Sequence, residues 1–176
     1  MRLQTPVQAV CLDWGGTLMS EDGPQDRPMA QWPVVQVLPG AAEALALLRG
    51  RLPLAIATNA SISRRPQIEA ALARAGLRAP FDHIFCFTEI GHRKDAAAFW
   101  QHVGEALSLP LSAIAMVGDS LEQDARGPRR HGVQGVWLRP AGAPVTTDVP
   151  QVDTLPEFAR AVLEARPAPS STRGMA

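Results

Sequence analysis

The sequence has few cysteines and no long hydrophobic run. Its two cysteines, Cys11 and Cys86, lie inside short apolar stretches, and their number and spacing exclude a disulfide framework or a zinc site. No stretch approaches the roughly 18 apolar residues that a membrane-spanning helix needs. The first apolar run ends at Asp13, without the longer core and the small-residue cleavage site of a signal peptide. These absences predict a cytoplasmic protein that does not contact a membrane.

The sequence also lacks net charge. Seventeen basic residues balance seventeen acidic ones, and the pI is about 6.9. There is therefore no basic surface to favour nucleic acid or an anionic membrane as a partner. Lysine is almost absent as well, because Lys94 is the only lysine among the seventeen basic residues. A single lysine in a chain that otherwise uses arginine suggests a specific requirement at that position.

What the sequence contains is enough apolar material for one domain. The chain has 176 residues, of which 46% are hydrophobic, so it is neither disordered as a whole nor long enough for several domains. We assign residues 1–166 to a single domain and predict that residues 167–176 form a disordered tail. Residues 20–37 are polar, proline-rich and without periodicity. We predict a loop there, which we call the flap.

Short apolar runs alternate with helical patterns along the domain. This alternation predicts crossover connections and therefore an α/β fold with a parallel sheet that helices cover on both faces. Strands are expected at Val7–Leu12, Leu54–Ala57, His83–Phe87, Ile114–Val117 and Gly135–Leu138. Helices are expected at Ala41–Arg49, Arg65–Ala75, Ala96–Leu107, Leu121–His131 and Leu155–Ala165.

Polar side chains follow four of these strands. They are Asp13, then Thr58 and Asn59, then Lys94, and finally Asp119, with Asp124 one helical turn later. Ligands bind at the carboxyl ends of the strands in open parallel sheets, so these groups are expected to converge. Carboxylates there suit Mg²⁺, while the lysine and loop N–H groups suit a phosphate. The pattern points to phosphoryl transfer.

The same residues resemble the four motifs of the haloacid dehalogenase superfamily. The segments are VCLDWGGTL, LAIATN, GHRKDAAAF and AMVGDSLEQDARG, in the order that the superfamily uses. The resemblance covers about residues 7–138. It implies a three-layer, Rossmann-like fold with strand order 5-4-1-2-3.

The resemblance also implies a role for each residue. Asp13 would be the nucleophile that forms an aspartyl-phosphate, and Thr58 and Lys94 would act with it. Mg²⁺ would bind the Asp13 carboxylate, the carbonyl of Gly15, Asp119 and Asp124. The phosphate-binding set would be Gly16, Thr17, Thr58, Asn59 and Lys94.

Gly15 departs from the superfamily pattern, because phosphatases of this superfamily carry a second Asp at that position as the general acid and base. Its loss predicts slow hydrolysis of ordinary phosphomonoesters and favours acyl phosphates, which have good leaving groups. The DWGGT segment also resembles the DWAGT of phosphonoacetaldehyde hydrolases. Those enzymes use a Schiff-base lysine, and the only lysine here is already assigned to the phosphate.

The spacing of the motifs leaves no room for a cap domain. A capless member of the superfamily is expected to act on a large or polymeric phosphorylated substrate, or to borrow a cap from a partner subunit in an oligomer. One alternative is a phosphate- or phosphoprotein-binding module without turnover, which Gly15 favours. A phospho-accepting receiver domain is a weaker alternative. A resemblance to receivers would imply an acceptor Asp at the end of the third strand, and the third strand here, HIFCF, ends without a carboxylate.

Overall fold

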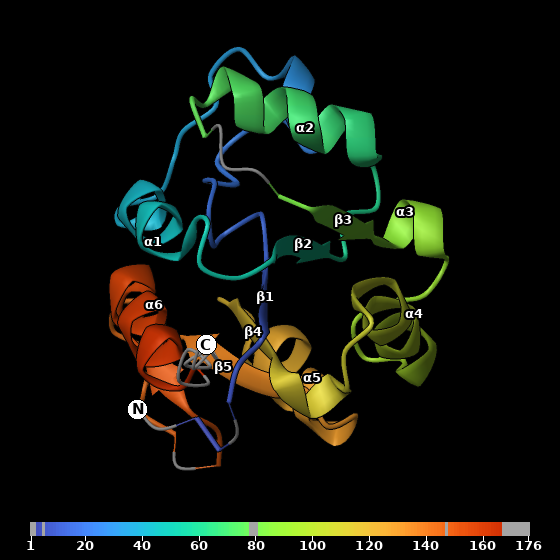
Figure 1. The fold of residues 1–176 in the computed structure, drawn as a ribbon. Helices are drawn as coiled ribbons and strands as arrows, with labels where there is room; N and C mark the ends of the chain where they lie inside the picture. The colour runs from blue at the N-terminus through green and yellow to red at the C-terminus, as the bar shows by residue number, and fades with distance from the viewer. Residues whose placement is uncertain (1–2, 5, 78–80, 147, 167–176) are drawn as a thin grey trace, which may run out of the picture.

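The structure is a computed structural model and describes residues 3–4, 6–77, 81–146 and 148–166. Helices lie on both sides of a central sheet (Figure 1). The tail prediction for residues 167–176 lies outside the described residues. No described helix has both the length and the apolar character that crossing a membrane requires.

Six parallel strands form the sheet in the order β3-β2-β1-β4-β5-β6. This confirms the predicted fold class and the predicted 5-4-1-2-3 order, and it adds one short strand beyond β5. The strands are β1 (Ala9–Leu12), β2 (Leu54–Thr58), β3 (His83–Cys86), β4 (Ile114–Gly118), β5 (Gln134–Leu138) and β6 (Gln151–Val152). Central β1 is hydrogen-bonded to β2 on one side and to β4 on the other, so its carboxyl end lies between theirs.

Helices cover both faces of the sheet. They are α1 (Ala41–Leu48), α2 (Arg65–Arg74), α3 (Phe87–Ile90), α4 (Ala97–Leu107), α5 (Gly127–Arg130) and α6 (Leu155–Glu164), with 3₁₀ turns at Met29–Gln31 and Leu111–Ala113. Successive residues of a strand point to opposite faces of the sheet, so they pack against different helices. Val10 and Leu12 pack with α1, α2 and α6, whereas Cys11 packs with Phe99 and Val103 of α4. Burial of continuous apolar strands on both sides is the main stabilising contribution to this fold.

The segment after β4 differs from the single helix expected at Leu121–His131. Leu121–Arg126 is a π-helical turn, in which the Gly127 N–H bonds to the carbonyl of Glu122, and α5 follows it. Pro128 supplies a physical reason: it has no N–H for the carbonyl of Asp124, and its ring would crowd that carbonyl in a regular helix. The wider π-helical turn avoids this clash.

Both ends of the flap are tied to the domain. The Ser20 N–H donates to the carbonyl of Gln36 at 2.8 Å, and the Leu38 N–H donates to the carbonyl of Leu18 at 2.9 Å. Met29 and Trp32 anchor the middle of the flap in the core. The other side chains of residues 21–37 are exposed or half-buried.

Both cysteines are free and buried, as their apolar context predicts. Burial raises the pKa of the Cys11 thiol to about 12, so it stays protonated and is a poor nucleophile at neutral pH.

Candidate active site

The carboxyl ends of the central strands meet at a cavity of about 400 Å³. Asp13 directly follows β1, Thr58 ends β2 and Asp119 follows β4, while Lys94 comes from the segment between α3 and α4. All four line the cavity. The parallel register of the sheet therefore brings together residues that lie up to 106 positions apart in the sequence, from Asp13 to Asp119.

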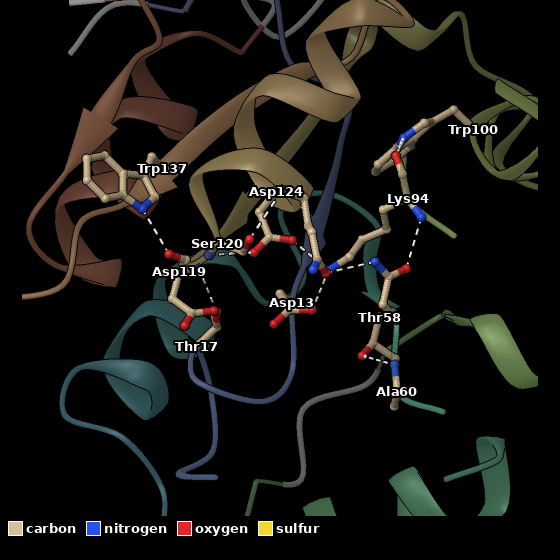
Figure 2. Close-up of polar contacts among 12 residues, drawn as sticks. Asp13, Thr17, Thr58, Ala60, Lys94, Trp100, Asp119, Ser120, Asp124 and Trp137 are labelled. Carbon is tan, nitrogen blue, oxygen red and sulfur yellow. Dashed lines mark hydrogen bonds and ion pairs between the residues drawn. The ribbon is translucent and has the colours of Figure 1, made fainter. Parts of the chain in front are cut away.

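Lys94 lies at the centre of the buried part of this cavity. Its Nζ donates to Asp13 Oδ1 at 2.6 Å and to Asp124 Oδ1 at 2.5 Å, and Figure 2 shows both carboxylates directed at it. Lys94 is only 1% exposed, which explains why a compact ammonium stands here in an arginine-rich chain. An unpaired charge at this depth would be strongly unfavourable, so both carboxylates help to keep the lysine in place.

The backbone of Lys94 is fixed by two further contacts. Its N–H donates to Asn59 Oδ1 at 2.9 Å. Its carbonyl accepts from Trp100 Nε1 at 2.7 Å (Figure 2). The amide of Asn59 also donates from Nδ2 to Gln123 Oε1 at 2.8 Å. Both ends of that amide are thus engaged in joining the loops after β2 and β4 to Lys94.

Asp119 is held from behind. Its N–H donates to Thr17 Oγ1 at 3.1 Å, its carbonyl accepts from Trp137 Nε1 at 2.9 Å, and the Thr17 hydroxyl makes a long contact of 3.5 Å with its Oδ1. Asp124 is fixed in a similar way, since its Oδ2 accepts from the Ser120 N–H at 2.9 Å. These contacts therefore hold the backbone of Asp119 and the carboxylate of Asp124.

Two glycines allow the carboxylates to approach the backbone. A Cβ on Gly16, whose φ is +69°, would lie 2.5 Å from Asp119 Oδ2. A Cβ on Gly118 would lie 2.2 Å from Asp124 Oδ2. Any larger residue at either position would displace one of the acidic groups, so the glycines shape the site without carrying chemistry themselves.

The electrostatics of the cluster show an excess of negative charge. Burial raises the pKa of Asp13 to about 7, with Lys94 opposing the rise and Asp124 and Asp119 adding to it. Burial also raises the pKa of Asp119, and the carboxylates of Asp124 and Glu21 raise it further. Burial alone would lower the pKa of Lys94, but attraction to Asp13 and Asp124 outweighs it and holds that pKa above its usual value. One ammonium thus faces three carboxylates.

The same three carboxylates are suitable ligands for a cation. Asp13, Asp119 and Asp124 each offer an oxygen, and these oxygens all lie within 4.8 Å of one another. An oxygen-only donor set with surplus negative charge fits a hard divalent ion such as Mg²⁺.

The structure gathers most of the site residues that the sequence predicts. Asp13, Gly15, Thr58, Asn59, Lys94, Asp119 and Asp124 all line the cavity. Thr17 instead lies behind Asp119 and bonds to it. Sequence reasoning missed the positioning contacts of Ser120, Gln123 and Trp100, which depend on loop geometry that no local pattern in the sequence reveals.

The chain also matches known proteins over part of its length. Residues 26–132 match the family model of the haloacid dehalogenase-like hydrolases. Over 102 residues the chain is 34% identical to the pyrimidine 5'-nucleotidase YjjG of Escherichia coli, covering 57% of this chain and 44% of that protein. Over 97 residues it is 35% identical to an (S)-2-haloacid dehalogenase of Pseudomonas, covering 54% and 40%. These matches span less than half the length of either relative.

Among solved structures, the fold is similar to that of a HAD phosphatase from Thermococcus onnurineus. The TM-score is 0.74 at 20% sequence identity, over 91% of this chain and 99% of that one. At this identity the likeness shows the fold alone, and the family model supplies the assignment. The chain belongs to the haloacid dehalogenase-like hydrolase family.

Proposed function

We propose that this protein is a Mg²⁺-dependent phosphohydrolase that works through an aspartyl-phosphate on Asp13. The observation that carries the proposal is the arrangement around that carboxylate. Asp13 sits at the end of the central strand, 2.6 Å from the Lys94 ammonium and within 4.8 Å of two further carboxylates that can share a cation. A nucleophilic oxygen, a fixed positive charge and a metal site in one cavity are the components that phosphoryl transfer needs.

The reaction divides into two displacements. In the first, a carboxylate oxygen of Asp13 bonds to phosphorus while the bond between phosphorus and the leaving oxygen breaks. In the second, water attacks phosphorus, the bond to Asp13 breaks and inorganic phosphate leaves. Lys94 stabilises the charge on the transferred group in both displacements, because its ammonium is already positioned beside the nucleophile.

The donor set fits Mg²⁺ at Asp13, Asp119 and Asp124, with the backbone carbonyl of Gly15 as a further oxygen. Bound there, the ion would offset the repulsion between the carboxylates and the phosphate and would polarise the phosphoryl group. Asp124 is already committed to Lys94 and Ser120. We therefore assign it mainly to orienting the site.

Phosphate oxygens would be held by the loops after β1 and β2. The Thr58 hydroxyl lies in the cavity wall, where it accepts from the Ala60 N–H at 3.1 Å and keeps its own proton for a phosphate oxygen. Backbone N–H groups near Gly16, Thr17 and Asn59 complete the proposed phosphate site. The Asn59 side chain contributes indirectly, by fixing Lys94.

The substrate class that we propose is a phosphorylated molecule whose remainder extends out of the cavity. The exposed flap residues Glu21, Gln25 and Arg27 line the same cavity as the nucleophile. A large or polymeric substrate suits such a site, and an acyl phosphate or a nucleoside monophosphate would test it. The nucleoside monophosphate is included because a curated relative is named as a pyrimidine 5'-nucleotidase.

Gly15 favours a second candidate, a module that binds phosphate groups without turnover. The acid–base Asp of the superfamily's phosphatases is absent from this position, and general acid–base catalysis contributes about 10²–10⁴-fold to rate. Mg²⁺-dependent binding of a phosphate analogue without hydrolysis would support this reading.

The test measures phosphate release from acetyl phosphate, an aryl phosphate and a pyrimidine nucleoside 5'-monophosphate, with and without Mg²⁺. Halide release from a 2-haloacid is measured in parallel, because another relative is a dehalogenase. Asp13→Asn is compared with Asp26→Asn, an exposed flap residue outside the cavity lining.

We expect Mg²⁺-dependent phosphate release that Asp13→Asn abolishes and Asp26→Asn preserves. Phosphate-analogue binding without release would favour the binding module. Halide release that needs Asp13 but no metal would replace the phosphohydrolase with a dehalogenase.

A further inference from the structure

The position of Glu21 relative to Gly15 leads to a further assignment. A Cβ built on Gly15 would lie 2.1 Å from Glu21 Oε1 and 2.7 Å from Glu21 Cδ. The carboxyl group of Glu21 therefore occupies the space in which a side chain at position 15 would begin. In the superfamily's phosphatases, that side chain is the Asp that handles the proton of the leaving group.

Glu21 also lies near the other residues of the proposed site. It lines the cavity together with Asp13, Lys94 and Asp119, and it lies close enough to Asp119 to affect the pKa of that carboxyl. Among the residues that the structure describes, none donates a hydrogen bond to the Glu21 side chain. A carboxyl group in this position is free to contact the leaving oxygen of a substrate.

Hydrogen bonds within the chain from Trp14 to Gln25 bring the backbone of Glu21 to this position. The Gly16 N–H donates to the carbonyl of Met19 at 2.8 Å, and the Leu18 and Met19 N–H groups both donate to the carbonyl of Trp14. The Glu21 carbonyl accepts from Gln25 Nε2 at 2.9 Å. The turn thus folds back on itself and returns residue 21 to the side of residue 15.

Neighbouring acids in the flap do not share this position. The Asp22 carboxylate turns back to Ser20, accepting its hydroxyl at 2.8 Å, and Asp26 pairs with Arg27 at 2.9 Å. Neither Asp22 nor Asp26 lines the cavity. Of the three flap acids that the sequence offers, only Glu21 is placed to serve Asp13.

We infer that Glu21 is the general acid and base of this enzyme, supplied by the flap in place of an Asp at position 15. The inference rests on the proposed phosphohydrolase function. As the bond between phosphorus and the leaving oxygen breaks, the Glu21 carboxyl donates its proton to that oxygen. The resulting carboxylate then takes a proton from the water that attacks the aspartyl-phosphate, which restores the acid.

The test compares substrates whose leaving groups differ in their need for a proton. An alkyl phosphate leaves as a strongly basic alkoxide, whereas acetyl phosphate leaves as acetate. The measured quantity is kcat/KM, which reports the steps up to the first irreversible one and so isolates formation of the phosphoenzyme. Glu21→Gln is the variant, and Glu164→Gln, on an exposed residue at the end of α6, is the matched control.

We expect Glu21→Gln to lower kcat/KM for the alkyl phosphate by about 10²–10⁴-fold and for acetyl phosphate by about tenfold or less. Glu164→Gln should change neither value. A loss equal for both substrates, accompanied by a higher Mg²⁺ requirement, would make Glu21 a metal-site residue and overturn the inference. So would a wild type that hydrolyses acetyl phosphate but no alkyl phosphate.

A positional swap provides a second, independent test. Gly15→Asp combined with Glu21→Ala moves the carboxyl from the flap to position 15, and Glu21→Ala alone is its reference. We expect the double variant to regain much of the kcat/KM for the alkyl phosphate that Glu21→Ala loses. No gain over Glu21→Ala, in a variant that melts like the wild type, would contradict the assignment.

Failure of this inference differs from failure of the proposed function. If Asp13→Asn leaves acetyl phosphate hydrolysis unchanged, the aspartyl-phosphate mechanism fails. If Asp13→Asn abolishes it while Glu21→Gln affects both substrates alike, only the role of Glu21 fails.

Discussion

The floor of the site and the flap above it are built in different ways. The floor, which consists of Asp13, Lys94, Asp119 and Asp124, is held by ion pairs and hydrogen bonds between elements distant in sequence. The flap, residues 20–37, is held by bonds within itself and at its two ends, and Met29 and Trp32 anchor it in the core. Arg74 of α2 also donates to the carbonyl of Ala30. Asp26 and Arg27 of the flap are exposed and pair with each other.

This difference separates two tasks. In the proposed reaction, the phosphate group, which all substrates share, would contact the floor. Any change of charge in the floor should also destabilise the folded protein. The part that varies between substrates would contact the flap, where substitutions of exposed side chains should change the free energy of unfolding only slightly. Substitutions in the floor should therefore affect folding and activity together, whereas substitutions of exposed flap side chains should affect activity alone.

Lys94→Met should give the largest loss of stability. It removes the only ammonium between two buried carboxylates, and breaking a buried ion pair on one side typically costs about 3–5 kcal/mol. In EDTA, the loss should become smaller at lower pH. Burial already raises the pKa of Asp13, and protonated carboxyls need no counter-charge. Urea unfolding at several pH values measures both effects.

Arg93→Met is the control for that experiment. Arg93 is the exposed neighbour of Lys94, and its guanidinium lies 4.4 Å from the centre of the Phe87 ring. An exposed cation–π contact contributes about 0.5–1 kcal/mol, so this change should cost much less. Equal losses of stability for the two variants would mean that burial of the Lys94 charge does not determine the stability of the floor.

Mg²⁺ should stabilise the folded protein by an intermediate amount. An ion that binds only the native state adds about 2.7 kcal/mol at 100 times its dissociation constant. Thermal melting with and without Mg²⁺ measures the gain. Asp119→Asn should remove most of it by taking away one of the three carboxylates, whereas Asp26→Asn should retain it. An unchanged gain in Asp119→Asn would place the ion elsewhere.

Val34→Ser should have the smallest effect. Val34 is a flap residue whose side chain is 74% exposed, and surface changes of this kind usually stay within about 0.5 kcal/mol. Urea unfolding should therefore match the wild type. A loss of more than about 1 kcal/mol would show that the flap contributes to the global stability of the domain and would weaken the contrast with the floor.

Most of the fold was predictable because its signals are long and regular. Five apolar strands and the helices between them carry clear patterns, and the structure confirms them within a few residues, except for the single helix expected after β4. Four elements were missed because they are too short to show a period: the four-residue helix α3, the two-residue strand β6 and the two three-residue 3₁₀ turns. The π-helical turn had a signal in Pro128, which has no N–H to donate and whose ring disfavours a regular helix at the preceding residues.

The candidate site was predictable as a set of residues and not as a geometry. Strand ends located Asp13, Thr58 and Asp119, and the rarity of lysine singled out Lys94. The bonds of Lys94 to Asp13 and Asp124 join residues 81 and 30 positions apart, and no local pattern reveals such pairs. For the same reason, the sequence offered Glu21, Asp22 and Asp26 equally, and only the folded turn distinguishes Glu21.

The burial of Lys94 has a consequence for chemical labelling. Every other cationic side chain apart from histidine is an arginine, so the folded protein presents almost no side-chain amine to an acylating reagent. The same holds for any modification that needs an accessible lysine. Acylation of Lys94 would require the strands and loops around it to separate first. Its rate of labelling would therefore report how often the site opens, read at the single side-chain amine of the sequence.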